Sequence, residues 1–326
     1  MKKTIAKDRK LIVILGPTAS GKSALGVQLA LWLSSRQAKK KLGIQGIEII
    51  SADSRQVYKG LDIGSGKITK KEMKGVPHHF LSVASSQRRF TVAQYQRLST
   101  KAIASVLRRR KLPILVGGSP LYIYSVVDGW SIPEVKPNLL LRKELEKLPI
   151  EKLFLKLKKL DPRRAKMLQE SSGQSKNKRR LIRALEIVLS TGKPVSPLKK
   201  HSVSTPWDNN AVTILGTHKD TRHLNVRIKK RFLQMLKRGF LNEIKKLRKQ
   251  GLSWNRIESF GLEYREGAQY LQGKISRKEM IEKAIKATKD FSRRQMTWFK
   301  KDSRIHWIRS YTDIERLTHK FLRKNA

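Results

Sequence analysis

A glycine-rich loop after an apolar run near the N-terminus contains the residues best suited to chemistry. The string LIVILGPTASGKS, Leu11 to Ser23, fits G-x-x-x-x-G-K-[ST] from Gly16 onward. The glycines let the backbone point successive N–H groups at phosphate oxygens, Lys22 adds a positive charge, and Ser23 offers a hydroxyl to Mg²⁺ at the start of a helix. We therefore expect a strand, a diphosphate-binding P-loop and a helix, rather than an ordinary strand-to-helix turn. A P-loop does not define the reaction, so kinase, NTPase and group transferase stay open.

An acidic residue follows the second apolar run, Ile47 to Ala52, in the string SADSRQVY. Residues just past the carboxyl end of a strand in an open parallel sheet face the ligand crevice, so Asp53 should face the P-loop. There Asp53 could hold Mg²⁺ or accept a proton. The alternative is that Asp53 and Ser54 only cap the next turn.

The third apolar run ends without an acid. The string PILVGGSPLY continues from Pro113–Val116 into Gly117, Gly118 and Ser119. A P-loop protein that hydrolyses ATP usually places an aspartate at this point to hold the metal. The sequence therefore argues against ATP hydrolysis.

The charge balance points to a polyanionic partner. The 326 residues include 73 Lys and Arg but 25 Asp and Glu, a formal net charge of +48. Such a charge destabilises a compact protein by self-repulsion unless a partner such as nucleic acid neutralises it. The alternative is a generally lysine-rich composition, with Lys39–Lys41 and Arg108–Lys111 as solvated surfaces.

The sequence contains no cysteine, which excludes disulfides, cysteine zinc sites and a thiol nucleophile, and fits a reducing cytosol. The start MKKTIAKDRK is too polar for a signal peptide, and no apolar stretch approaches the ~20 residues of a membrane span. We expect a cytoplasmic protein that is not membrane-bound.

The apolar pattern predicts an α/β fold with a P-loop NTPase-like parallel sheet flanked by helices. Expected strands are 11–15, 47–52, 113–116, 211–215 and 305–308. Between Asn138 and Leu189 the apolar residues have helical spacing only, which predicts an all-helical insertion. The expected domains are a core in two parts, residues 1–135 and 206–326, and a helical insertion at 136–205 that ends in a linker, Val195–Asn210.

Helix boundaries can also be expected from local signals. Asp161 before Pro162, Asn177 and Asp220 are predicted N-caps, and Gly192 ends the helix that Asn177 begins. Two further apolar stripes are expected, one in each of two C-terminal helices. They are Leu224, Ile228, Phe232, Met235 and Leu236 after Asp220, and Ile281, Ile285, Thr288 and Phe291 in a helix from about Lys278 to Lys300.

Taken in order, eight strings resemble the tRNA dimethylallyltransferases, also called tRNA isopentenyltransferases, over about residues 10–300. They are GPTASGKS, DSRQVY, DIGSGK, PHH, GGSPLY, RALE, DTRHLNVRI and RRQMTWF. Some matches are inexact. Ser119-Pro120 stands where the family has Thr-Gly, Ile68 stands in place of a proline, and Gly261-Leu262 in place of Gly-Tyr. Pro120 removes a backbone N–H, which puts the geometry of that loop in question.

The resemblance implies transfer of a dimethylallyl group from its diphosphate to the exocyclic N6 amine of the adenosine immediately 3′ of the anticodon, with tRNA and dimethylallyl diphosphate as partners, Mg²⁺ as cofactor and a monomeric enzyme. It implies catalytic roles for Asp53 as proton acceptor, Ser119 in holding Asp53 or the base, and Lys22. Donor contacts are implied for Gly16, Pro17, Thr18, Ala19, Ser20, Gly21, Lys22, Ser23 and Arg222 or Arg227, with Ser23 also at the metal.

The same resemblance and the mixture of arginine with aromatic residues in RRLIRALE and RRQMTWFK imply tRNA contacts. These are expected at Asp53, Ser54, Arg55, Gln56, Ser119, Arg142, Arg179, Arg180, Leu181, Ile182, Arg183, Arg293, Arg294, Gln295 and Trp298. The adjacent histidines His78 and His79 should point to opposite faces of an extended segment, so a structural or base-stacking role is favoured over a metal pair. A small-molecule or nucleoside kinase and a non-enzymatic RNA-binding scaffold are the alternatives.

Overall fold

The computed structural model describes residues 9–35, 43–133, 135–170, 177–197, 205–207, 211–217 and 220–323. The cationic run Lys39–Lys41, the first eight residues and parts of the predicted linker Val195–Asn210 lie outside the described residues. The chain divides into two compact units. The first is Met1–Gly129 with Ser204–Ala326, and the second is Trp130–Val203.

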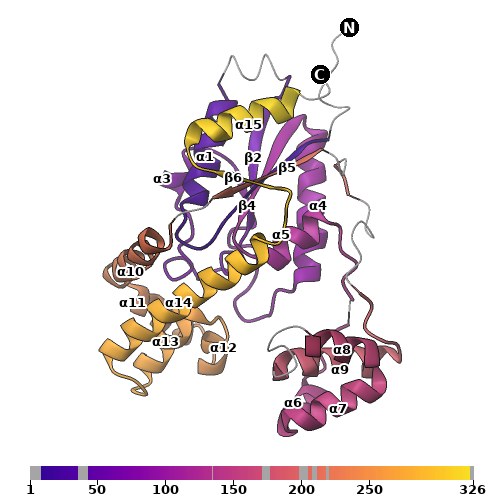
Figure 1. Ribbon diagram of the computed structural model, residues 1–326. Helices are drawn as coiled ribbons and strands as arrows, with labels where there is room; N and C mark the ends of the chain where they lie inside the picture. Colours follow the sequence, from indigo (N-terminus) through magenta and orange to yellow (C-terminus); the bar gives the residue numbers. More distant parts are fainter. Residues whose placement is uncertain are drawn as a thin grey trace. The chain divides into compact units, whose positions relative to one another are not determined.

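The first unit is built on a parallel sheet of six strands in the order β3-β2-β4-β1-β5-β6 (Figure 1). The strands are β1 Leu11–Leu15, β2 Gly46–Ala52, β3 His78–His79, β4 Lys111–Gly117, β5 Val212–Thr217 and β6 Ile305–Ile308. The predicted strands are all confirmed. Sequence reasoning missed β3, because its two residues are too short for an apolar pattern. Strand β1 lies inside the sheet between β4 and β5, so the P-loop leaves from its centre.

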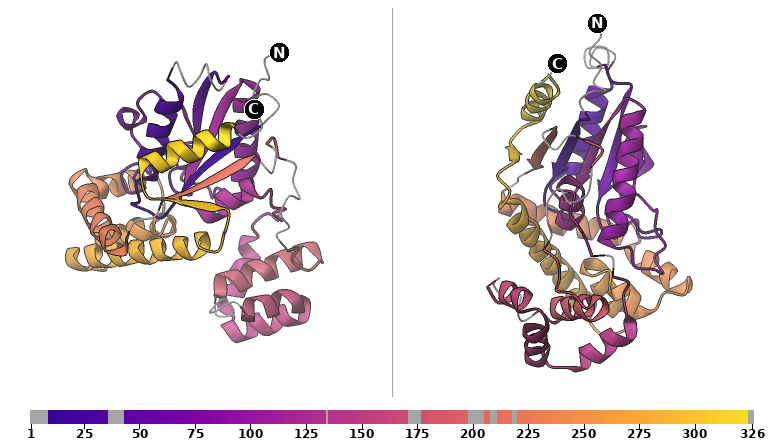
Figure 2. Two further views of the ribbon diagram at one scale, coloured as in Figure 1. Left: turned by 45° about the horizontal axis from the view of Figure 1, so that its top comes forward. Right: turned by 90° about the vertical axis from the view of Figure 1, so that its right-hand side faces the viewer.

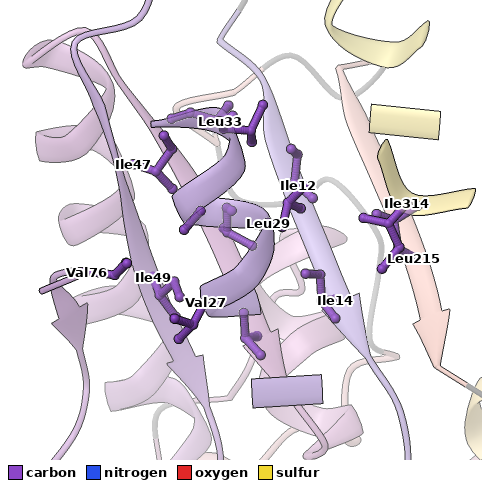
Figure 3. Packing of buried hydrophobic residues seen from close by; sticks show 14 of the residues in the cluster. Ile12, Ile14, Val27, Leu29, Leu33, Ile47, Ile49, Val76, Leu215 and Ile314 are labelled. Carbon is purple, nitrogen blue, oxygen red and sulfur yellow. The ribbon is translucent and has the colours of Figure 1, made fainter. Parts of the chain in front are cut away.

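Helix α1 (Lys22–Leu33) covers one face of this sheet. Figure 3 shows its Val27, Leu29 and Leu33 near Ile12 and Ile14 of β1 and Ile47 and Ile49 of β2, all of them buried. Burying a side chain of this kind stabilises the fold by about 1.5–3 kcal/mol relative to exposure. The P-loop is therefore anchored at both ends in a rigid core.

The remaining helices of the first unit lie around the sheet, and some of them form a group beyond one end of it (Figures 1 and 2). They are α3 Lys70–Met73, α4 Val92–Arg108, α5 Pro120–Val127, α10 Thr221–Lys237, α11 Phe240–Lys249, α12 Trp254–Glu258, α13 Leu262–Leu271, α14 Arg277–Phe299 and α15 Tyr311–Arg323. The views agree that α10 to α14 form one group at that end. Across the described ranges, no helix is long and apolar enough to cross a membrane.

Two of these helices test the predicted stripes. In α10 the cap at Asp220 is confirmed, and the predicted apolar residues are buried except Leu236, which is half-buried. In α14 the fully buried stripe includes Met280, Ala284 and Phe299 instead, with only Thr288 shared. The predicted Ile281, Ile285 and Phe291 are half-buried on the neighbouring face.

The second unit consists, in its described part, of helices only. They are α6 Leu139–Lys147, α7 Ile150–Leu160, α8 Pro162–Glu170 and α9 Lys178–Thr191, packed around a shared apolar core. The predicted caps are confirmed, since Asp161 Oδ1 accepts from Arg164 N and Asn177 Oδ1 accepts from Arg180 N. Gly192 ends α9 with a φ of 65°, a left-handed conformation that favours glycine.

Candidate active site

The P-loop joins β1 to α1 and is fixed by contacts from distant strands. Gly21 has a φ of 95°, and a Cβ at Gly16 would lie 1.9 Å from Thr217 Oγ1. Thr217 Oγ1, at the end of β5, hydrogen-bonds Ser20 Oγ at 2.7 Å. Both glycines of the motif are therefore required by the backbone, one for its conformation and one for close packing.

Lys22 is the first residue of α1, and its Nζ donates to the Pro17 carbonyl at 3.1 Å. Burial lowers the pKa of Lys22 to about 8, an effect opposed by Asp53 and reinforced by Arg231. A bound anion would restore the charged form by adding a favourable partner. The protonation of Lys22 therefore depends on whether an anion is bound in the P-loop.

Asp53 follows β2 and makes a tight turn. Its Oδ1 accepts from Arg55 N at 2.8 Å and from Gln56 N at 3.3 Å, so the capping interpretation is correct for this oxygen. Ser119, after β4, accepts at Oγ from Ser54 N at 3.0 Å. Ser119 therefore holds the backbone beside Asp53 rather than the Asp53 carboxylate itself, and its expected alternative role, holding the adenine base, stays a prediction.

A pocket of about 280 Å³ lies where these strand ends meet helices α10, α13 and α14. It brings together residues predicted to bind the donor and residues predicted to contact tRNA. The sequence-predicted residues that line it are Thr18, Lys22, Ser23, Asp53, Ser54, Arg55, Gln56, Ser119, Arg294 and Gln295. The P-loop Lys22 and the Asp53 carboxylate therefore line one cavity, as the sequence predicts.

Pro120 leaves the Gly-Gly-Ser loop intact. It is the first residue of α5, a position at which a helix needs no N–H donor and at which the fixed φ of proline is favourable. The neighbouring Ser119 N still donates to Ala52 O at 3.1 Å, which ties the loop to β2. The loop therefore accommodates Pro120 without a change in its hydrogen bond to β2.

A second, more open groove of about 980 Å³ lies against the P-loop and α10, and it distinguishes the two candidate arginines. Arg227 lines this groove with Lys22, and a Cβ at Gly21 would lie 3.5 Å from an Arg227 guanidinium nitrogen. Arg222 is exposed in the first turn of α10 and lines neither cavity. The geometry therefore favours Arg227.

Sequence reasoning missed several ionisable residues of the pocket, among them Arg231 and Glu263. Arg231 lines both cavities and donates to Ser65 O at 3.3 Å. Glu263 is buried, accepts from Thr288 Oγ1 at 3.0 Å, and has a pKa raised by burial. The spacing of four residues from Arg227 to Arg231, one helical turn, was the available signal for the first; Glu263 had none.

Arg55, which was predicted, has a guanidinium buried beside Asp53, and burial lowers its pKa. Its Nε has no hydrogen-bond partner among the described residues.

Two other motifs make internal contacts and also line the cavities, DIGSGK through Gly66 and PHH through His78. Lys67 of DIGSGK donates to Tyr58 O, Asp62 Oδ1 and Ser82 Oγ at 2.6–2.8 Å. His78 Nδ1 lies 2.8 Å from Val76 O, and His79 Nε2 lies 2.7 Å from the buried carboxylate of Glu48. Within the described residues, no group of three His, Cys, Asp or Glu side chains could hold a metal ion.

In the second unit, the expected RNA contacts of Leu181 and Ile182 need correction, and two of the arginines have internal partners. Arg142 and Arg183 bind the buried Glu186 carboxylate, at 2.6 Å and 2.5 Å. Leu181 and Ile182 are buried in the core of the unit, so their side chains cannot contact RNA. Sequence reasoning missed this because it treated the basic string as one surface. Arg179 and Arg180 are exposed.

In the first unit, α14 presents the remaining expected contacts. Arg294 lines the pocket, whereas Arg293 is exposed and pairs with Asp290 at 3.1 Å. Trp298 is 39% exposed and stacks on Tyr124, with ring centroids 6.4 Å apart. Gln295 is buried, and its contacts are described below.

Fold and site together define a P-loop α/β protein that holds a phosphate-binding loop beside a carboxylate. The IPP transferase family matches residues 56–302. A tRNA dimethylallyltransferase of Corynebacterium diphtheriae is 38% identical over 91% of this chain and 93% of its own length, and one of Pelotomaculum thermopropionicum is 36% identical over 97% and 96%. The chain belongs to the tRNA dimethylallyltransferase family.

Solved structures agree with this assignment. The tRNA isopentenylpyrophosphate transferase of Bacillus halodurans matches with a TM-score of 0.66 and 32% identity, covering 96% of this chain and 97% of that one. A eukaryotic dimethylallyltransferase acting on tRNA matches with a TM-score of 0.68 and 25% identity, covering 94% of this chain and 75% of that one.

Proposed function

We propose that this protein transfers a dimethylallyl group from dimethylallyl diphosphate to the N6 amine of the adenosine immediately 3′ of the anticodon in tRNA, and releases diphosphate. The observation that carries the proposal is that Lys22 and Asp53 line the same pocket. The names of the relatives support the donor and the RNA acceptor. We propose further that the enzyme acts as a monomer in the cytoplasm.

In the proposed step the adenosine nitrogen attacks C1 of the dimethylallyl group. The N–C bond forms, the C–O bond to diphosphate breaks, and the nitrogen loses one proton. Negative charge develops on the departing diphosphate, where the P-loop N–H groups, Lys22 and Arg227 stabilise it. No phosphoryl group is transferred, which agrees with the lack of an acid after β4.

Asp53 is the proposed proton acceptor. The hydrogen bonds recorded to its carboxylate within the described ranges are made to Oδ1 and hold the turn. Oδ2 is therefore the oxygen that we assign to the amine proton. A positioned base of this kind contributes about 10²–10⁴-fold to the rate.

The residues present fit a Mg²⁺ ion bound mainly through the substrate. Ser23 lines the pocket at the N-terminus of α1, and the described chain offers no cluster of acidic or histidine ligands. Mg²⁺ commonly takes one or two protein ligands and completes its shell with phosphates and water. Ser23 would hold the ion, which when bound neutralises charge on the diphosphate.

The adenosine amine is unreachable while its base is stacked, so the nucleotide must be flipped into the pocket. We propose that Arg294 and the exposed Trp298 meet RNA from the first unit, and that the exposed Arg179 and Arg180 do so from the second. The exposed positive charge would then act on the phosphates of the anticodon stem-loop.

The test is a diphosphate-release assay with dimethylallyl diphosphate and unmodified tRNA, without any nucleotide. We expect release that requires both substrates. A kinase would release no diphosphate in this assay and would convert ATP to ADP when ATP is supplied in a parallel reaction, and an RNA-binding scaffold would bind tRNA without turnover in either. Either result would refute the proposed function.

A further inference from the structure

Gln295 connects three elements from one buried position. It lies on α14 and its side chain is 3% exposed. Its Oε1 accepts from Thr18 N in the P-loop at 2.9 Å, and its Nε2 donates to Gly118 O in the loop after β4. Gln295 thus bridges two loops that come from neighbouring strands, β1 and β4.

The two partners fix the orientation of the amide. A backbone N–H can only donate and a carbonyl can only accept, so Oε1 must face Thr18 and Nε2 must face Gly118. A buried polar group left without its partner is unfavourable, which makes this orientation strongly preferred.

Gly118 shows how closely the two loops approach. A Cβ at this position would lie 2.6 Å from Gln295 Nε2, 3.1 Å from Gly16 O and 3.2 Å from Lys22 Cε. The Gly-Gly-Ser loop therefore packs directly on the P-loop, with the Gln295 amide against both. A shift of either loop would break at least one of these contacts.

The contacts continue to the proposed base. Gly118 is followed by Ser119, whose Oγ accepts from Ser54 N, and Ser54 follows Asp53. A chain of hydrogen bonds and short backbone segments therefore runs from Thr18 through Gln295, Gly118 and Ser119 to the turn of Asp53.

We propose that Gln295 is a positioning residue that clamps the P-loop to the Gly-Gly-Ser loop and thereby sets the separation between the diphosphate and Asp53. This rests on the proposed function, and it replaces the expectation that Gln295 contacts tRNA. Because a misplacement of about 1 Å can reduce a rate about 10²-fold, the clamp should affect the transfer step itself.

Gln295→Met tests the clamp, since it keeps the length of the side chain but removes both hydrogen bonds. We expect the single-turnover transfer rate at saturating substrates to fall about 10²-fold, with the Kd for tRNA within about twofold of the wild type. Thr297→Val, an exposed position on the same helix, is the matched control and should transfer normally. A wild-type rate for Gln295→Met would overturn the clamp. A weakened tRNA affinity with an unchanged saturated rate would instead make Gln295 an RNA contact.

Gln295→Glu provides a second readout that a general loss of packing would not give. A carboxylate accepts from Thr18 N but repels Gly118 O, whereas the protonated acid can donate to Gly118 O as the amide does. The rate of this variant, divided by the wild-type rate at the same pH, should rise as pH is lowered from about 8 to about 5.5. A ratio independent of pH would contradict the clamp.

Hydrogen exchange separates this inference from the proposed function. In Gln295→Met, the backbone amides of Gly16 and of residues 18–21 should exchange at least about tenfold faster than in the wild type, whatever the enzyme transfers. Unchanged exchange would overturn the clamp. If the wild type shows no transfer while exchange rises as expected, the clamp stands and the proposed function fails.

Discussion

Ser119 and Ser54 join the ends of two neighbouring strands, because Ser119 Oγ accepts the Ser54 N–H at 3.0 Å. Strand β2 ends one residue before Asp53, and β4 ends two residues before Ser119. The hydroxyl therefore fixes the backbone on which the Asp53 side chain stands. The role of Asp53 in the turn and its role in proton transfer involve different atoms, which allows the two to be separated.

Asp53→Asn separates the role of Asp53 in the turn from its proposed role in proton transfer. The amide keeps an oxygen that can accept from Arg55 N and Gln56 N, so the turn should hold, but it cannot take the amine proton. We expect the single-turnover rate to fall about 10²-fold or more. The Kd values for donor and tRNA should change little. A variant that transfers at nearly the wild-type rate would reduce Asp53 to a turn cap.

The pKa of Lys22 predicts a pH dependence. Burial lowers this pKa to about 8, so in the enzyme without donor Lys22 is charged below pH 8 and neutral above it. kcat/KM for dimethylallyl diphosphate should therefore fall above about pH 8, approaching tenfold per pH unit. Lys22→Arg, whose guanidinium stays charged, should lack this fall even if it is slower overall. An identical fall in both proteins would assign it to another group.

Arg227 and Arg222 form a matched pair on α10. Arg227→Gln removes a cation beside the P-loop and should raise KM for the donor by about 10- to 100-fold, the loss expected for one hydrogen bond to a charged group. Arg222→Gln, at an exposed position away from both cavities, should change KM less than about twofold. Steady-state kinetics at saturating tRNA measure both, and the reverse order would contradict the placement of the diphosphate.

Arg294 and Arg183 should respond differently to substitution by glutamine. Arg294 lines the pocket, so its loss should flatten the dependence of log affinity for tRNA on log salt by about one unit. Arg183 binds buried Glu186, so its loss should lower stability by about 2 kcal/mol, since Arg142 still pairs with that carboxylate. Salt titrations and denaturant unfolding check the two effects. An unchanged salt slope for Arg294→Gln would favour the lysine-rich alternative.

The sequence was sufficient where one local signal determines a local structure. The P-loop follows from glycine and lysine spacing, the caps at Asp161, Asn177 and Asp220 from their short polar side chains, and the position of Asp53 from the end of its strand. The predicted stripe of α14 was wrong except at Thr288, because apolar residues lie on two adjacent faces of that helix and periodicity does not tell the two faces apart.

The rest of the site depends on contacts between distant parts of the chain. Gln295 reaches the P-loop from α14, and no spacing in the sequence records that approach. The sequence alone likewise does not tell whether Arg183 contacts RNA or pairs with Glu186. The structure shows the pairing with Glu186, whose carboxylate is 0% exposed and requires cations around it.

The central claim is that dimethylallyl diphosphate and the adenine that accepts the dimethylallyl group meet between Lys22 and Asp53. Its most direct test is to incubate the protein with radiolabelled dimethylallyl diphosphate and tRNA that lacks the modification, then digest the RNA and locate the label. We predict one label per tRNA, on N6 of the adenosine immediately 3′ of the anticodon, with the initial rate of labelling reduced about 10²-fold or more in Asp53→Asn. RNA without label, or equally fast labelling by the wild type and Asp53→Asn, would contradict the claim.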